Sequence, residues 1–575
     1  MGQPQHLEYG EAVLNASLQD SPQQNPSLAE DAVFKKYANK SLPTGLAKTT
    51  SGLTAYSGAW TRAEVIHLLR RTMFGIKEAD IQILLSKTPG AAVDYLFSNV
   101  PSSAPAPPVN NYQNSYADTT GIAAGQSWVN AAYGDGTLNA YRRTSFKSWY
   151  FGVLLNQNLS ILEKMTFFWA NHFSTEADTI GDARMTYKHH ALLRANALGN
   201  FKSLVKLVTV DPGMLRYLNG YLNTKSAPDE NYGRELQELF TLGKNNTPNY
   251  IEDDVKAAAQ VLTGWRIDNN TLTSYFDATK HSTTNKQFSS FYGNAVINYQ
   301  SGANGANETD QLIDMIFAKT ETAQFICRKL YRYFVYYDID SSVESTIIQP
   351  LAQTLISNGF NIVPVLKQLL KSDHFFAATS RACAIRNPLD FLLGTMRTFN
   401  VGLPATFTDE QRYKIWNYLR GVGANLALDL ADPPNVSGYA AYYQTPEYYE
   451  IWINSNTLPK RMLFTDTMLS TGFSAGTGTA IKIDVIAFAS QCSAVGDPDD
   501  LVAWCTELLL GLDVSATKKT TLKSILLSGQ TSNHYWTQAW SDYQTNPNTT
   551  NTNIVKSRMS SLLTTITRLA EHQLG

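Results

Sequence analysis

Apolar residues recur at helical spacing along most of the chain, and segment 164–173, KMTFFWANHF, shows the pattern clearly. Met165, Phe168, Trp169 and His172 occupy positions i, i+3, i+4 and i+7, which lie on one face of a helix. Similar stripes, separated by Gly, Pro, Asn and Asp, fill most of residues 59–400 and return after residue 401. The sequence therefore predicts an all-α fold, a predominantly helical body of many helices.

Two predicted helices have recognisable start signals. Ser160 and Glu163 have the spacing of a capping box, and Asp211 followed by Pro212 is typical of an N-cap with proline at the first helical position. Residues 266–300 differ from their surroundings, because Asn, Thr, Ser, Tyr and Phe alternate there with a weak period of two. This stretch predicts a long loop with a small hairpin.

The polarity of the chain divides it into three parts. Residues 1–58, rich in Gln, Ser, Pro and Asn, predict an extended N-terminal arm, long enough to lie across a neighbouring subunit. Residues 59–400 form the predicted helical core, and residues 401–575 form a C-terminal helical section packed on that core.

Composition excludes several classes of function. The net charge is -2 and no long Lys/Arg run occurs, so nothing indicates a nucleic-acid partner. No apolar run is long enough for a transmembrane segment, and the first thirty residues lack the pattern of a signal peptide. The chain is therefore cytoplasmic or a mature or trimmed form.

None of the four cysteines forms a CxxC pair, and the spacing of Cys492 and Cys505 is compatible with a disulfide but does not establish one.

Segment 229–243, DENYGRELQELFTLG, concentrates polar groups in a chain that has only 17% charged residues. Its apolar face consists of Tyr232, Leu236, Leu239 and Phe240. Its opposite face consists of Asn231, Arg234, Glu235 and Glu238. Periodicity alone predicts that this polar face is solvated and carries one ion pair, between Arg234 and Glu238, worth a few tenths of a kcal/mol. Leu242 falls within the polar arc, which indicates that this side also contacts protein.

A buried polar face would have chemical consequences. Two carboxylates beside an arginine form an acid/base pair or half of a metal site. A divalent metal, the one cofactor that the pattern suggests, could take Glu235, Glu238 and His172 as ligands. The segment is neither HExxH nor the paired ExxH of di-iron bundles, so the metal hypothesis rests on these three residues alone.

The histidines allow two interpretations each. His172 continues an apolar stripe, so it is a core histidine or a buried ligand or general base. His190 shares a face with Leu193, which directs the adjacent His189 toward solvent. His281, in the aromatic-rich loop, is expected to be solvated.

Six segments in this order resemble a large bacterial family known as domain of unknown function 1800. They are HLLRRTMFG (67–75), KMTFFWANHF (164–173), ALGNFKSLVKLVTVDPGMLRYLN (197–219), ENYGRELQELFTLG (230–243), a segment ending LTGW (252–265) and DPPNVSGY (432–439). The resemblance implies an exported protein, often encoded beside a sulfatase-like partner, with no established activity. Its motif residues fall here on His172, Asn231, Arg234, Glu235, Glu238, Trp265 and His281. It also implies that Glu235 and Glu238 are buried and paired.

Two functional hypotheses follow. In the first, an exported protein has a buried polar centre and is a metal-dependent or acid/base enzyme. Glu235 or Glu238 is then the general base or metal ligand, Arg234 binds an anion, His172 is a second base or ligand, and Asn231 orients them. In the second, a cell-surface or assembly protein uses the same residues as a structural polar network, and its arm contacts another subunit of a homo-oligomer.

Overall fold

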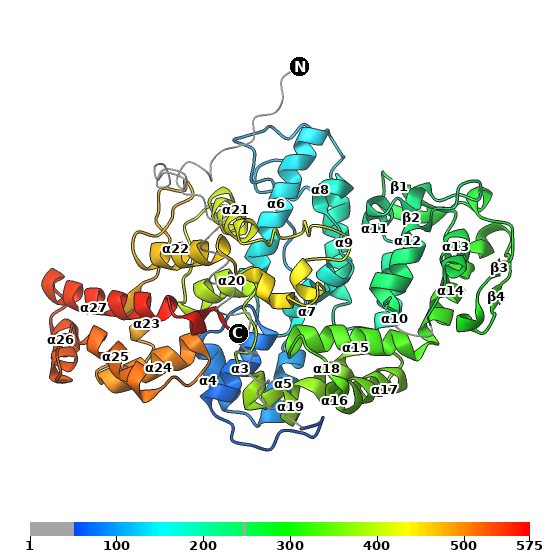
Figure 1. Ribbon diagram of the computed structural model, residues 1–575. Helices are drawn as coiled ribbons and strands as arrows, with labels where there is room; N and C mark the ends of the chain where they lie inside the picture. Colours follow the sequence, from blue (N-terminus) through cyan, green and yellow to red (C-terminus); the bar gives the residue numbers. More distant parts are fainter. Residues whose placement is uncertain (1–50, 245–248) are drawn as a thin grey trace, which may run out of the picture. The chain divides into compact units, whose positions relative to one another are not determined.

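Helices make up most of residues 51–244 and 249–575, the part of the chain described by the structure, a computed structural model (Figure 1). The all-α fold class predicted from the sequence is confirmed. The first helices are α3 (Arg62–Thr72), α4 (Glu78–Leu85), α5 (Pro89–Ser98), α6 (Gly136–Leu155), α7 (Leu162–His172), α8 (Ala177–Ile180), α9 (Ala183–Ala195), α10 (Phe201–Thr209), α11 (Pro212–Tyr217) and α12 (Glu230–Glu235). The middle helices are α13 (Glu252–Val261), α14 (Asn307–Phe317), α15 (Thr320–Phe334), α16 (Ser341–Val343), α17 (Gln349–Ser357), α18 (Ile362–Leu370), α19 (Asp373–Phe376) and α20 (Pro388–Thr398). The last helices are α21 (Asp409–Asn425), α22 (Thr457–Leu469), α23 (Val485–Ala489), α24 (Pro498–Leu510), α25 (Ala516–Leu526), α26 (His534–Thr545) and α27 (Thr549–Thr567).

Of the two helix starts predicted from the sequence, one is confirmed. Asp211 caps α11 through a hydrogen bond that its side chain accepts from the Met214 amide, and Pro212 begins the helix. The capping box predicted at Ser160 is wrong, because α7 begins at Leu162 after Ile161 and has no side-chain cap. Glu163 is unavailable for that role, since its carboxylate pairs with Arg194 at 2.6 Å.

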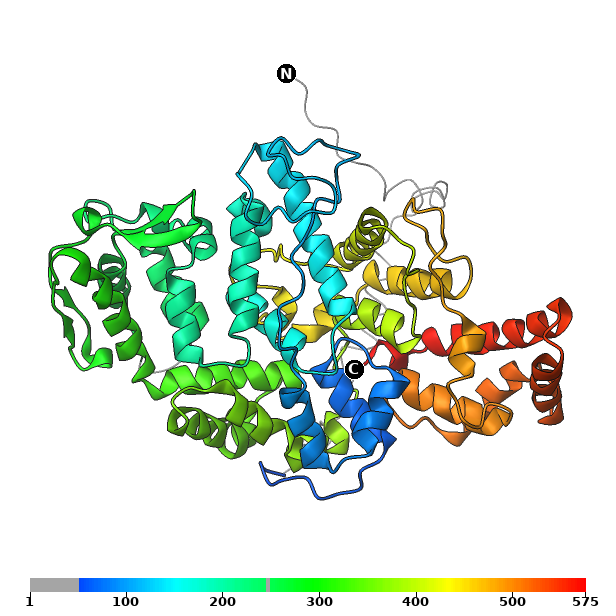
Figure 2. The same ribbon diagram turned by 180° about the vertical axis from the view of Figure 1, so that it is seen from behind.

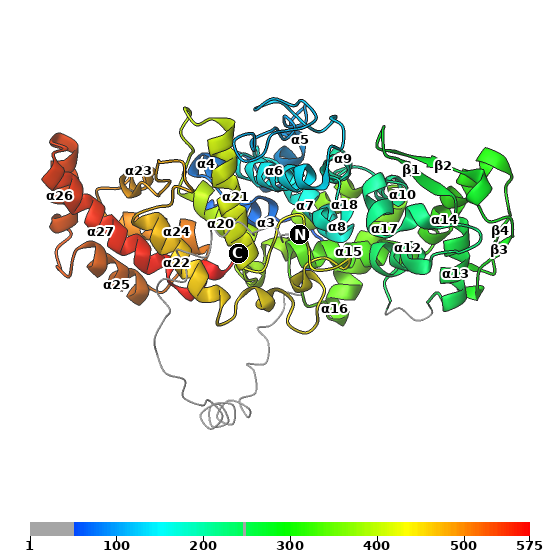
Figure 3. The same ribbon diagram turned by 90° about the horizontal axis from the view of Figure 1, so that it is seen from above.

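Strands occur where the sequence predicted a small hairpin. Strands β1 (Trp265–Asp268) and β2 (Thr273–Phe276) pair antiparallel, with Trp265 opposite Phe276. A second antiparallel pair, β3 (Lys286–Gln287) and β4 (Val296–Ile297), follows within the same stretch. Figure 3 shows these strands beside α13 and α14, which contact β3 and β4 respectively.

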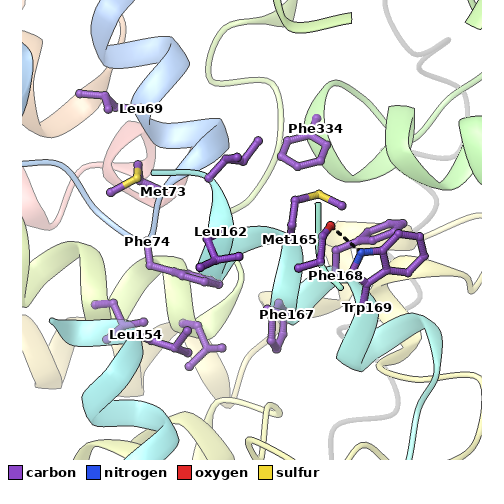
Figure 4. Packing of buried hydrophobic residues seen from close by; sticks show 14 of the residues in the cluster. Leu69, Met73, Phe74, Leu154, Leu162, Met165, Phe167, Phe168, Trp169 and Phe334 are labelled. Atoms are coloured by element: carbon purple, nitrogen blue, oxygen red, sulfur yellow. Dashed lines mark hydrogen bonds between the residues drawn. The ribbon is translucent and has the colours of Figure 1, made fainter. Parts of the chain in front are cut away.

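A single large apolar cluster runs through the described residues, and α7 lies inside it. Figure 4 shows Leu162 and Met165 of α7 between Met73, which directly follows α3, and Phe334 of α15. Trp169 is fully enclosed, and its indole N–H donates to the carbonyl of Ala197 at 2.9 Å. The helical stripe read from KMTFFWANHF is therefore the centre of the core.

Helices distant in sequence pack closely. Helix α6 lies along α21, as the view from behind also shows (Figure 2). A Cβ atom added at Gly152 of α6 would lie 2.7 Å from the ring of Trp416 in α21, so only glycine permits this approach. Near the other end of the chain, Arg62 of α3 pairs with Glu507 of α24 at 2.9 Å.

Residues 51–575 form one unit, and a division near residue 400 stays a prediction. Residues 1–50 of the predicted arm lie outside the described residues. Within the described part, all four cysteines are free, so Cys492 and Cys505 are not bonded to each other. No helix in that part combines the length and apolar character needed to cross a membrane.

Candidate functional site

The motif helix changes its geometry halfway along. Helix α12 ends at Glu235, and the chain continues as a π-helix, η3 (Leu236–Thr241). A π-helix has more residues per turn than an α-helix, so the faces calculated from an α-helical period fail after Glu235. Gln237, Thr241 and Leu242 are accordingly buried. The expected contact of Leu242 with protein is confirmed. Its place within a polar arc is wrong, because that arc was calculated from the α-helical period.

Asn231 and Arg234 lie on the outside of this helix. Asn231 is exposed. Arg234 is half-buried and pairs with Glu252 and, at 3.2 Å, with Glu230. The predicted ion pair between Arg234 and Glu238 is wrong, because Glu252, the first residue of α13, and Glu230 take the guanidinium instead. Partly exposed pairs of this kind contribute about 1 kcal/mol or less to stability.

Glu235 and Glu238 lie at the border between protein and solvent. Both are half-buried, and Glu238 pairs with Lys244 at 3.0 Å. The carboxylate of Glu235 forms no hydrogen bond or ion pair with any described residue. Burial, and then the charge of Glu238, raise the pKa of Glu235 above its ordinary value. The structure thus brings the two glutamates within electrostatic reach of each other and leaves one of them free.

His172 is buried against the carboxyl end of the same helix. Its Nε2 atom donates to the carbonyl of Phe240 at 3.0 Å, and its Nδ1 atom accepts from Lys329 at 3.1 Å. Lys329 also donates to the carbonyl of Leu239 at 3.3 Å. Burial, then the charge of Lys329, hold the pKa of His172 well below its usual range. Burial, then Arg332, lower the pKa of Lys329 to about 7.

These contacts separate His172 from the glutamates. Both of its ring nitrogens are occupied by Phe240 and Lys329. Throughout residues 51–244 and 249–575, no three His, Cys, Asp or Glu side chains gather in a way that could hold a metal ion. The set of His172, Glu235 and Glu238 is therefore not assembled as a three-ligand site.

His281 was expected in solvent, and this expectation is wrong. Its side chain is 1% exposed, with Nε2 at 3.1 Å from Glu308 and Nδ1 at 2.8 Å from the carbonyl of Thr263. Lys286 completes the group at 2.5 Å from the same carboxylate. The indole of Trp265 donates to Thr309 nearby, at 3.0 Å. Every charged member has a partner, which is the arrangement of a structural network rather than of an open site.

A separate cavity lies among α3, α7, α15, α20 and the loop 441–452, with about 90 Å³ open to water. Two of its lining residues are glycines that contact each other. Gly75 has φ of +80°, and a Cβ atom there would lie 2.6 Å from the Cα atom of Gly394. We call this space the arginine cavity, because its cationic lining residues are Arg70, Arg71, Lys164, Arg332 and Arg386.

One carboxylate faces these cations. Asp390 pairs with Lys164 and accepts a hydrogen bond from Asn387 at 2.7 Å, so its charge is already committed. Arg386 has two buried donors, Nε and Nη2, without a partner among the described residues, whereas Arg71 has one, its Nε atom. An unpaired buried cation is costly, and its free donors mark a place for an acceptor.

Like charges in the arginine cavity oppose one another. Burial, then Arg386 and Arg71, lower the pKa of Arg70 to about 9, although three main-chain carbonyls accept from its guanidinium. Burial lowers the pKa of Arg386 itself to about 10. His572, at the rear of the cavity, has a pKa well below its usual range, because of burial and then Arg386. The cavity therefore favours a negative charge.

Tyrosines also line the arginine cavity. The members are Tyr333, Tyr336, Tyr337, Tyr442, Tyr448 and Tyr449. Tyr337 packs against Tyr449 with ring centroids 5.0 Å apart, and the guanidinium of Arg332 lies 5.4 Å from the ring centre of Tyr448. An aromatic wall beside a guanidinium wall is suited to a ligand that has both an anionic group and an apolar or polyhydroxyl body.

Comparison with known proteins places the chain in a family. A family model described as "Protein of unknown function (DUF1800)" matches residues 67–574. The chain belongs to the DUF1800 family. Searches of curated proteins and of solved structures each returned no match. The resemblance found in the sequence is thus confirmed over nearly the whole of the chain.

Sequence patterns missed the arginine cavity of this DUF1800 chain. The signal was present, because Arg70 and Arg71 interrupt the apolar segment HLLRRTMFG, and Arg386 precedes the N-cap Asn387 of α20. A charge within an apolar stretch costs free energy unless it has a partner or a ligand. Nothing in the local pattern shows that segments more than 300 residues apart meet at one cavity.

Proposed function

We propose that this protein binds a small anionic ligand in the arginine cavity. One observation carries the proposal: Arg386 lines the cavity with two buried donors that no described residue accepts. Guanidinium groups bind carboxylate, phosphate and sulfate groups through two parallel hydrogen bonds. A ligand oxygen pair at Arg386 would satisfy both donors at once.

The charges around Arg386 support the same proposal. Arg70 and Arg71 donate to main-chain carbonyls, which hold both guanidiniums in place but do not neutralise their charges. Arg461 lies behind Arg386, donates to its carbonyl at 2.8 Å and has a pKa lowered to about 9, chiefly by burial. A bound anion would reduce the repulsion among these cations, and this reduction would contribute favourably to the free energy of binding.

The experiment is a calorimetric titration of the full chain with inorganic phosphate, sulfate and citrate at low ionic strength. We expect saturable binding of at least one anion, weakened tenfold or more in Arg386→Met, because a bidentate charged pair contributes about 1.5–3 kcal/mol or more. Arg568→Met is the matched control, since Arg568 is exposed and pairs only with Asp466. Equal affinity in wild type and Arg386→Met would refute the proposal.

Glu235 supports a second candidate function, the acid/base or metal-dependent enzyme. A half-buried carboxylate with no described partner and a raised pKa is suited to general-base catalysis. Elemental analysis of the purified protein separates the two forms of this proposal. Stoichiometric metal that Glu235→Gln abolishes would support the metal-dependent form. Substoichiometric metal that the substitution leaves unchanged would remove it.

Export is proposed on the family resemblance, together with a cell-surface location. The low content of charged residues, 17%, supports it, because neutral polar surfaces are common in exported proteins. A homo-oligomer or a sulfatase-like protein is the proposed partner. Fractionation of the source cells, followed by size-exclusion chromatography with light scattering, tests location and assembly together.

A further inference from the structure

A second cavity lies between α6, α7 and α9 and the loop 430–439. It has about 30 Å³ open to water, and its walls are largely apolar, from Phe146, Phe167, Leu193, Leu430 and Pro433. A water molecule needs roughly 10–15 Å³ measured in this way, so the space fits a molecule of only a few heavy atoms. We call it the histidine cavity.

Three polar atoms in its lining have no partner. They are Nε2 of His189, Nε2 of His190 and the hydroxyl of Tyr150, and each is buried without a hydrogen bond to any described residue. The three side chains are 4%, 4% and 1% exposed. Buried polar atoms normally have partners, so three exceptions at one small cavity indicate a ligand.

His189 is held in one orientation. The sequence predicted that His189 faces solvent, and this prediction is wrong. Its Nδ1 atom lies 2.9 Å from Oδ2 of Asp211, and both side chains are buried. Asp211 is itself fixed, since the same oxygen accepts from the Met214 amide at 3.0 Å as the cap of α11. The carboxylate accepts a hydrogen bond from Nδ1–H, which leaves the lone pair of Nε2 free to accept a hydrogen bond from a ligand.

Gly213 makes this arrangement sterically feasible. A Cβ atom at this position would lie 2.9 Å from Oδ2 of Asp211 and 3.1 Å from Cβ of His189. Any larger residue would therefore push the start of α11 away from α9. The close approach brings the carboxylate to the histidine.

The remaining polar groups of the cavity are uncharged. Burial, then Arg194 and His189, lower the pKa of His190 to about 3, so this imidazole is neutral at physiological pH. Burial raises the pKa of Tyr150 well above its usual value, so its phenol keeps its proton and can donate. The two rings pack with centroids 4.1 Å apart. The walls offer no cation to neutralise an anionic ligand.

We propose that the histidine cavity binds a small uncharged molecule, or an exposed hydroxymethyl group of a larger one, through a hydroxyl. That hydroxyl donates to Nε2 of His189 and accepts from the phenol of Tyr150. Asp211 is a positioning residue that fixes the acceptor nitrogen. This site is independent of the arginine cavity, because its ligand is uncharged whereas the ligand proposed for the arginine cavity is an anion.

Histidine NMR tests the proposal, because the chain has only 9 histidines. The full chain is labelled at the histidine Cε1 carbons and titrated with ethylene glycol, and His189→Gln assigns the His189 signal. We expect a saturable shift of the His189 and His190 signals, while the signals of His67 and His572, buried elsewhere, stay constant.

Three variants make the test specific. Tyr150→Phe removes the donor and should weaken the binding of ethylene glycol about fivefold, the effect of one neutral hydrogen bond. Gly213→Ala should weaken it as well, whereas Gly421→Ala, a helical position with no heavy atom within 4 Å of the added Cβ, should leave it unchanged. A linear shift that never saturates, or equal affinity in wild type, Tyr150→Phe and Gly213→Ala, would overturn the proposal.

Discussion

His172 donates from Nε2 to the carbonyl of Phe240 at 3.0 Å, across 68 residues of sequence. The carbonyls at the end of a helix lack partners within it, and here His172 takes one and Lys329 takes that of Leu239. The histidine that the motif suggested as a catalytic base is therefore bonded at both nitrogens and joins α7 to η3. This geometry favours the structural interpretation of His172.

Replacement of His172 tests that interpretation. His172→Leu would leave the Phe240 carbonyl without its partner and Lys329 with only the carbonyl of Leu239, so we expect a loss of about 1–3 kcal/mol in the free energy of unfolding. Urea denaturation at pH 7 measures it. His534→Leu is the control, because His534 is exposed, and it should change stability by about 0.5 kcal/mol or less. Unchanged stability of His172→Leu would contradict the structural role.

Lys329 predicts a pH dependence of stability. Its folded pKa of about 7 lies below the value of about 10.4 expected in the unfolded chain, so the unfolded state binds more protons between these two values. Stability contributed by this group therefore rises as the pH increases from 7 toward 10 and is lost as the pH falls through 7. Thermal unfolding of wild type and Lys329→Met at pH 6 to 9 measures the difference.

We expect the difference in Tm between wild type and Lys329→Met to become more favourable to wild type as pH rises. Lys256→Met, at an exposed lysine that pairs with Asp253 on the same helix, should show no such trend over this range. Parallel Tm profiles for wild type and Lys329→Met would show that Lys329 is fully protonated in the folded protein throughout.

Packing of α6 on α21 gives a matched pair of glycine substitutions. Gly152→Ala places a methyl group 2.7 Å from the Trp416 ring, an overlap that costs about 1–3 kcal/mol and outweighs the helical gain of about 0.5–1 kcal/mol. Gly421→Ala on the partner helix meets no atom within 4 Å and should gain that helical term. In urea denaturation we expect Gly152→Ala to lower the free energy of unfolding and Gly421→Ala to raise it. Stabilisation by both substitutions would contradict the close contact.

How far the sequence predicts this structure depends on the range of the interaction. The helical period located α7 and the core stripe, and the alternation in residues 266–300 located the hairpin, because both are local. Glu238 was given the wrong partner, since a π-helical turn and Lys244, just beyond the end of that turn, decide its contacts. His189 was placed in solvent, because Asp211 reaches it only through the tertiary packing of α11. The arginine cavity was missed for the same reason.

Arg386 links stability to the proposed binding. Its unpaired guanidinium is a cost to the ligand-free protein, so Arg386→Met, which keeps a long apolar side chain against Phe391, should raise the free energy of unfolding by about 0.5–2 kcal/mol. The same variant should lose the stabilisation that a saturating anion gives to wild type. Differential scanning calorimetry with and without the anion measures both effects. A site residue should gain stability and lose binding on substitution, whereas a purely structural arginine should lose stability, so destabilisation of ligand-free Arg386→Met would count against an anion site at this position.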